Sequence, residues 1–88
     1  MEVWIGDLRF DPEVEAKIQQ KHNLTAARVR EAVALGAADR MDWHAHPVYG
    51  WRLIATGTDA DGHRIIAYLR PVDRDEETWE CLTAMMEE

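Results

Sequence analysis

Hydrophobic residues follow two different spacings along the chain. Near both ends they alternate with polar residues, as in strands, and between these stretches they recur every three or four residues, as in helices. Alternation over residues 3–10 predicts a half-buried N-terminal strand. Asp11 and Pro12 then form a typical helix start, an N-cap followed by proline at the first helical position. Asn23 is the expected stop, because asparagine tolerates the left-handed conformation that closes helices. The first helix is therefore predicted between Pro12 and Asn23.

A second helix is predicted immediately after this stop. Thr25 is its expected N-cap, Gly36 is its expected end, and Leu24 is expected to fill the corner between the two helices from inside. The helical spacing predicts an inner apolar stripe made of Val29, Ala32, Val33 and Leu35. The result is a pair of short helices joined by a tight corner.

Strand spacing returns at residue 48 and continues towards the C-terminal end. The sequence DADG at residues 59–62 lies between two β-rich runs and predicts a hairpin turn. Pro71 is expected to end the second of these strands or to mark its edge. Residues 78–86 predict a last strand, expected at the edge of the sheet. One side of that strand is predicted to carry Trp79, Cys81, Thr83 and Met85.

This order predicts an α+β fold: an N-terminal strand, a two-helix hairpin and a three-stranded antiparallel meander. A helix pair with one apolar stripe and a meander with one apolar face each need a cover, and packing them together supplies both. The 88 residues form a single predicted domain, 1–88, because the chain is too short for two cores.

Charge and composition narrow the function classes. The net charge of −7 argues against nucleic-acid binding through overall charge, although six of the acids lie in residues 75–88 and the rest of the chain is nearly neutral. No apolar run approaches the roughly 20 residues that span a bilayer, and the N-terminus does not resemble a signal peptide. The single cysteine, Cys81, indicates a reduced, cytoplasmic protein without membrane contact.

Two groups of cationic side chains are candidates for phosphate contact. Lys21 and His22 form a cationic corner at the end of the first helix; alternatively, they only complement the helix C-terminus. A second group lies on the predicted hairpin, where period-2 spacing puts Arg64, Tyr68 and Arg70 on one face. Arg52 and His63 lie nearby. The alternative is that these arginines are cross-strand partners of Glu80 and other acids.

Metal and cofactor sites are not predicted. His44 and His46 would share one face of an extended segment near Asp42, but zinc needs three or four converging ligands, and an incidental loop is the preferred interpretation of residues 42–46. The DADG sequence lacks the spacing and the terminal glutamate of a calcium loop. It is interpreted as a turn.

The four tryptophans exceed what a small core can hide. Tryptophan is enriched at the energetic centres of protein interfaces. Trp43, Tyr49, Trp51 and Trp79 are therefore candidates for contact with a protein partner or a second copy of the chain. The alternative is that they fill the core.

The chain resembles the BrnT-like proteins of the RelE/ParE toxin superfamily in three stretches: FDPEVEAKIQQKHNLTAARVREAV, GWRLIATGTDADGHRIIAYLR and WECLTAM. The matching positions are Asp11-Pro12, Lys21-His22, Gly50, Gly57, Gly62, Arg64 and Thr83-Ala84. The resemblance implies a bacterial toxin of a type II toxin–antitoxin pair, inhibited by a cognate antitoxin. It also implies cleavage of RNA without a metal.

The roles implied by this resemblance fall on the cationic residues. Arg64 and Arg70 would contact the phosphate, His22 or His63 would move the proton, and Lys21 would give electrostatic support. The chain departs from the family at its end, where residues 84–88 read AMMEE and the family's last strand ends in arginine. That departure supports an alternative function: a non-catalytic protein-interaction domain on the same scaffold.

Overall fold

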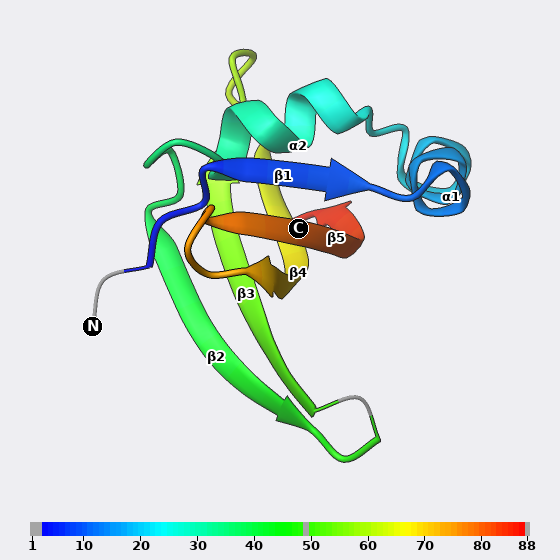
Figure 1. Ribbon diagram of the computed structural model, residues 1–88. Helices are drawn as coiled ribbons and strands as arrows, with labels where there is room; N and C mark the ends of the chain where they lie inside the picture. The colour runs from blue at the N-terminus through cyan, green and yellow to red at the C-terminus, as the bar shows by residue number, and fades with distance from the viewer. Residues whose placement is uncertain (1–2, 49, 88) are drawn as a thin grey trace.

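Two helices pack on one face of a five-stranded sheet in the computed structural model, which describes residues 3–48 and 50–87 (Figure 1). The elements in chain order are β1 (Asp7–Phe10), α1 (Pro12–His22), α2 (Ala26–Val33), β2 (Arg40–His46), β3 (Gly50–Thr58), β4 (Arg64–Asp73) and β5 (Thr78–Met86). The predicted α+β class is confirmed. Neither helix of this described part is long and apolar enough to cross a membrane.

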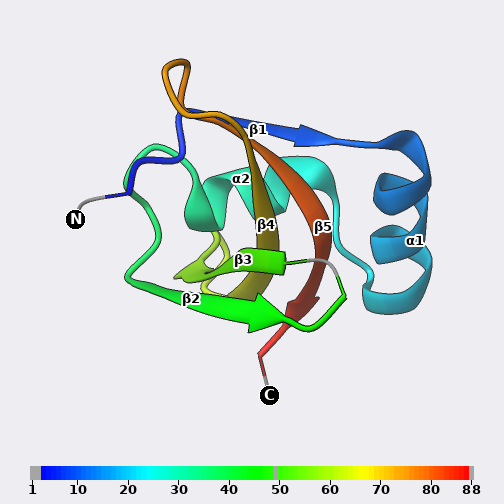
Figure 2. The ribbon, with the colours of Figure 1, turned by 60° about the horizontal axis from the view of Figure 1, so that its bottom comes forward.

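The sheet has the strand order β1-β5-β4-β3-β2, with β1 parallel to β5 and the other neighbours antiparallel. The predicted meander is present as β3, β4 and β5, but the sheet extends beyond it on both sides. The interpretation of residues 42–46 as a loop is wrong, because Arg40–His46 forms β2 and pairs with β3. The last strand is also not an edge, since β5 lies between β1 and β4 (Figure 2).

Local caps define the helix pair as predicted. The Asp11 carboxylate accepts a hydrogen bond from the Glu13 backbone N–H at 2.9 Å, and the Thr25 hydroxyl accepts one from the Arg28 N–H at 3.2 Å. Asn23 closes α1 in the left-handed region, with φ of 54°. Leu24 fills the corner and is fully buried. These local contacts define the ends of the two helices and the corner between them.

Helix α2 lies directly on β3 at Gly57. A Cβ atom at this position would come within 1.7 Å of the Ala32 carbonyl oxygen, so only glycine permits this approach. Val29, Ala32 and Val33 are buried, as the helical stripe predicts. Leu35 does not belong to that stripe: the helix has already ended, and Leu35 is 68% exposed.

A β-bulge in β5 changes which residues face the helices. Tyr68 is paired with Thr83 and Leu69 with Cys81, so Leu82 is an extra residue in β5. The prediction of one continuous side is therefore correct only up to Cys81. After the bulge, Ala84 is the buried residue.

The β3–β4 hairpin forms as predicted around residues 59–63. Its turn is closed by a hydrogen bond from the Asp59 N–H to the His63 carbonyl at 3.0 Å. Pro71 lies within β4, past the last β3–β4 pair and beside a register shift, where its missing N–H is tolerated. The core lies between this sheet and the two helices.

Candidate functional site

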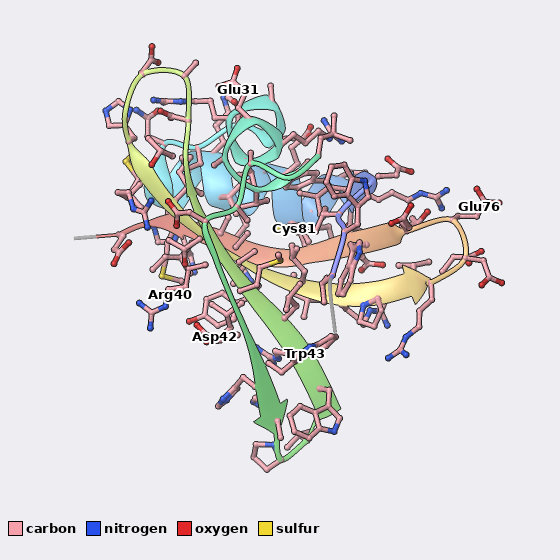
Figure 3. The ribbon with its side chains drawn as sticks, turned by 90° about the vertical axis from the view of Figure 1, so that its left-hand side faces the viewer. Glu31, Arg40, Asp42, Trp43, Glu76 and Cys81 are labelled. Carbon is pink, nitrogen blue, oxygen red and sulfur yellow. The ribbon has the colours of Figure 1, made fainter. Side chains whose placement is uncertain are left out.

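Aromatic side chains from separate elements meet on the helix side of the sheet. Because Gly57 lies under α2 and side chains alternate along a strand, Trp51 and Leu53 share the helix side of β3. Trp43 is paired with Leu53, so it points the same way. Figure 3 places Trp43 on the opposite side of β2 from Arg40 and Asp42. We name this group the tryptophan surface, made of Trp4, Trp43, Trp51, Pro71 and Trp79.

Hydrogen bonding and ring contacts organise the tryptophan surface. The Trp79 Nε1–H donates to the Trp4 carbonyl at 3.0 Å, and this contact fixes a buried ring of β5 to the segment before β1. The Trp43 and Trp79 rings lie 5.9 Å apart at a tilt of 42°, a favourable aromatic geometry. The Trp4 ring lies against Gly36, whose φ of 82° a larger residue would adopt only with strain. The surface is therefore held in place by its own contacts.

This surface is exposed because the helices do not reach it. Helix α1 contacts β5, and α2 contacts β3 and β4. At about 1.5 Å per residue, helices of 11 and 8 residues cannot cover a sheet that continues to β2. As a result Trp4 is 47% exposed, Trp43 41% and Trp51 64%. Large apolar side chains are rarely left together in this way without an interaction role.

A shallow pocket of about 160 Å³ lies at the centre of the tryptophan surface. Its apolar wall includes Trp4, Trp43, Pro71 and Trp79, and a second hollow continues past Trp43 to Met41. Polar side chains form part of the rim: Asp73, Arg74, Glu77 and Thr78. An apolar centre with a polar rim is the general organisation of a protein-binding site.

The opposite, outer face of the sheet carries the predicted arginine stripe. Arg64, Tyr68 and Arg70 do share one face of β4, but the arginines are paired with acids. The Arg70 Nη2 lies 2.8 Å from Glu80. Arg64 donates to both carboxylate oxygens of Asp39 and lies 3.5 Å from Glu87. This hydrogen bond lowers the pKa of Asp39 and raises that of Arg64, so both groups remain charged.

A second cationic row crosses the same outer face. His44 is paired directly with Arg52. The last residues paired between β3 and β4 are Leu53 and Leu69. Arg52 and Arg70 are the next residues of the two strands beyond this pair, so they come next along the same register. Burial, with the charges of Arg52 and His44, lowers the pKa of His46. Asp42, His44 and His46 alternate onto this face, but the described residues form no metal-ligand group there.

His63 belongs to a different cluster, in the β3–β4 turn. The buried Asp59 carboxylate accepts 2.9 Å hydrogen bonds from the Asp61 and His63 backbone N–H groups. Burial raises the pKa of Asp59, but these hydrogen bonds and the charge of Arg28 outweigh it, and the net shift is downward. Arg28 Nε lies 3.1 Å from Asp59, and Arg28 Nη2 lies 2.8 Å from His63 Nδ1.

The three potential metal-ligand atoms of this turn lie within 4.8 Å of one another, on Asp59, Asp61 and His63. Arg28 is close to all of them, with its Nη2 3.6 Å from Asp61. The guanidinium thus supplies the positive charge that a metal ion would bring. Through these contacts Arg28 joins α2 to the β3–β4 turn.

Lys21 and His22 lie at the end of α1, away from the other candidates. Lys21 is exposed and His22 is half-buried next to the Asn23 cap, positions that suit the helix C-terminus. In Figure 1, α1 is separate from the β3–β4 turn. The structure therefore does not bring His22, His63, Arg64 and Arg70 together around one point.

The predicted partner-binding residues, in contrast, do converge. Trp43, Trp51 and Trp79 belong to the tryptophan surface, whereas Tyr49 lies outside the described residues. Sequence reasoning did not select Trp4 and Pro71 for this site. Trp4 is included because of the Trp79–Trp4 contact, which joins residues 75 positions apart and leaves no local signal. Pro71 is included because it is paired with Trp79 across β4 and β5.

Comparisons with known proteins add no relative: no protein-family model, no curated protein and no solved structure matches this chain. The tryptophan surface offers exposed, organised apolar area. Among the cationic candidates, Arg64 and Arg70 belong to separate ion pairs, and Lys21 and His22 lie apart from them at the end of α1.

Proposed function

We propose that this chain is a protein-binding domain and that its partner docks on the tryptophan surface. The observation that carries this proposal is the exposure of three tryptophans along two neighbouring hollows. Trp4 and Trp43 line one hollow, and Trp43 and Trp51 line the other. Burial of such rings gives roughly 25 cal/mol for each Å² removed from water. Tryptophans at the centre of interfaces commonly contribute about 2 kcal/mol or more to binding. A cytoplasmic location, where Cys81 stays reduced, belongs to the same proposal.

The test compares two exposed apolar residues, one that belongs to the tryptophan surface and one in the loop after α2 that does not. Trp51 is 64% exposed and Leu35 is 68% exposed. The tagged chain is expressed in a bacterial host together with an untagged copy, and proteins retained after a high-salt wash are quantified. We expect Trp51→Ser to reduce a stoichiometric protein partner by about tenfold or more, and Leu35→Ser to leave it unchanged.

Equal retention by the wild type and Trp51→Ser would contradict the proposal. Folding of each variant is checked by circular dichroism, so that loss of the partner is not confused with loss of the domain. High salt is used because an apolar interface persists there, whereas phosphate contacts weaken steeply.

RNA cleavage by a BrnT-like toxin, restrained by an antitoxin, is the second candidate. This candidate includes a RelE/ParE-like fold. The order of one strand, two helices and then antiparallel strands supports it. A specific observation favours RNA contact: His44, Arg52 and Arg70 follow one row of the outer face beside Tyr68. Cleavage ranks second because a phosphate would have to displace Asp39 from Arg64 and Glu80 from Arg70.

Arg52→Gln tests this second candidate, with Lys17→Gln on α1 as the charge-matched control. If the chain acts on RNA, Arg52→Gln should weaken binding of a single-stranded RNA and reduce its salt dependence, and Lys17→Gln should do neither. RNA that remains intact and unbound at low salt would remove the candidate.

A further inference from the structure

The two edges of the sheet are built differently. β1 has four residues, two of them charged, and the Arg30 Nε donates to the Leu8 carbonyl at 3.0 Å. β2 also has two charged residues, Arg40 and Asp42, but it is seven residues long, Arg40–His46, and contains no proline, glycine or lysine. Natural edge strands are normally protected from pairing with another chain by short length, by proline or lysine, or by a covering segment. Among the described strands, β2 is therefore the edge suited to accept one.

β2 is also complementary to itself. An antiparallel pair of two β2 strands centred on Trp43 would set Trp43 against Trp43 and Met41 against Ala45 on the helix side. On the outer face, Asp42 would lie against His44 and Arg40 against His46, and the symmetry would repeat both pairs. Opposite side chains of a two-fold interface must match in this way, because each residue meets its own sequence.

We propose that a second copy of this chain is the partner, with β2 paired antiparallel to β2 of that copy and centred on Trp43. This inference rests on the protein-docking function proposed above. The two sheets become continuous, and the two tryptophan surfaces meet across the new strand pair. Trp43 changes from a half-exposed ring at an edge to a central contact.

Charge favours a second copy at this edge over other parts of the chain. The net charge of −7 repels another copy in general. In β2, however, Arg40 and Asp42 cancel, and their side chains form an ion pair at 3.1 Å. The strand is thus locally neutral. Helices α1 and α2 contact β3, β4 and β5, so they leave the β2 edge accessible.

The experiment exploits the predicted contact between Asp42 and His44. In a dimer of Asp42→Lys, each introduced lysine faces a histidine; in a dimer of His44→Asp, each introduced aspartate faces Asp42. When the two variants are mixed, one contact becomes lysine against aspartate and the other remains Asp42 against His44. We expect each variant alone to dimerise at least about tenfold more weakly than the wild type, and the equimolar mixture to recover dimerisation.

The measurement is sedimentation velocity over a wide concentration range, with Glu76→Lys as the control. Glu76 is exposed in the β4–β5 turn, away from β2 (Figure 3), so this charge reversal should leave dimerisation unchanged. Recovery in the mixture also demonstrates that both variants are folded.

Three results would overturn the inference: a wild type that stays monomeric, a dimer unaffected by Asp42→Lys, or a mixture that does not recover. A monomer that still retains a different protein through Trp51 would remove only self-pairing. If Trp51→Ser left the dimer unchanged and the mixture still recovered dimerisation, β2 pairing would be supported. The proposal that the partner docks on the tryptophan surface would then be contradicted.

Discussion

Gly57 gives the sharpest test of how α2 is held on the sheet, because the replacement of one hydrogen by a methyl group creates a defined clash. The Cβ of an alanine would lie 1.7 Å from the Ala32 carbonyl oxygen, 1.7 Å short of the 3.4 Å at which ordinary contact begins. It would also lie 2.8 Å from the Ala32 carbonyl carbon. Both atoms belong to the helix backbone, so no side-chain rotation relieves the contact.

The cost can be estimated from the movement required. α2 must move by well over an ångström away from β3, and such overpacking typically costs 1–3 kcal/mol and occasionally more. The movement also loosens Val29, Ala32 and Val33, which are buried against the sheet. We therefore expect Gly57→Ala to lower the free energy of unfolding by about 3 kcal/mol, a large share of the roughly 5–15 kcal/mol typical of a domain.

Gly62→Ala is the matched control. Gly62 has a φ of 87°, and a Cβ there would meet nothing within 4 Å. Its cost is backbone strain alone, about 1 kcal/mol. Urea unfolding followed by tryptophan fluorescence measures both variants. If Gly57→Ala were no less stable than Gly62→Ala, the close contact between α2 and β3 would be refuted.

Two further variants and one thiol-reactivity experiment test other contacts. Asp59 has a folded-state pKa below its ordinary value of 3.8, so its ionised form stabilises the fold above pH 3.8 and this contribution is lost as the pH falls through the folded-state pKa. Asp59→Asn should therefore lower the urea midpoint at neutral pH, with a difference from the wild type that shrinks as the pH is taken below 3.8; a constant difference would contradict this. Burial raises the pKa of Cys81 to about 12, so its thiol should react with a thiol reagent only at the rate of unfolding, and fast reaction of the folded protein would contradict its burial. Arg30→Ala should cost about 1–2 kcal/mol in urea unfolding, because it removes the hydrogen bond to Leu8 and the stacking of Arg30 5.0 Å from the Phe10 ring; unchanged stability would contradict both roles.

The helix pair was predictable from sequence because its determinants are local. Asp11 and Thr25 cap backbone groups within three residues of themselves, and Asn23 adopts its left-handed conformation at its own position. The β3–β4 turn is similarly encoded by four consecutive residues. Each of these features depends on the type of a few residues and on the short spacing between them. Residue type and spacing can both be read from a single sequence.

β2 and the tryptophan surface were harder to predict because they depend on distant partners. Arg40–His46 is exposed along nearly its whole length, so the core leaves little imprint on its sequence, and its strand conformation depends on pairing with β3. The bulge at Leu82 shifts the buried side of β5 without a proline or glycine to mark it. The face shared by Arg64 and Arg70 was predictable from alternation, but the contact between Arg64 and Asp39 required the fold.

The parallel pairing of β1 with β5 has a consequence for synthesis on the ribosome. Leu8 lies opposite Trp79, so the first strand cannot take its place until the last strand has left the exit tunnel. Until β5 emerges, the apolar side chains of β1 lack the strand with which they pair. The helix pair and the β3–β4 hairpin can already form from local contacts. Completion of the sheet thus depends on the emergence of β5, and a nascent chain stalled before β5 would expose the edges of β1 and β4 that β5 normally joins.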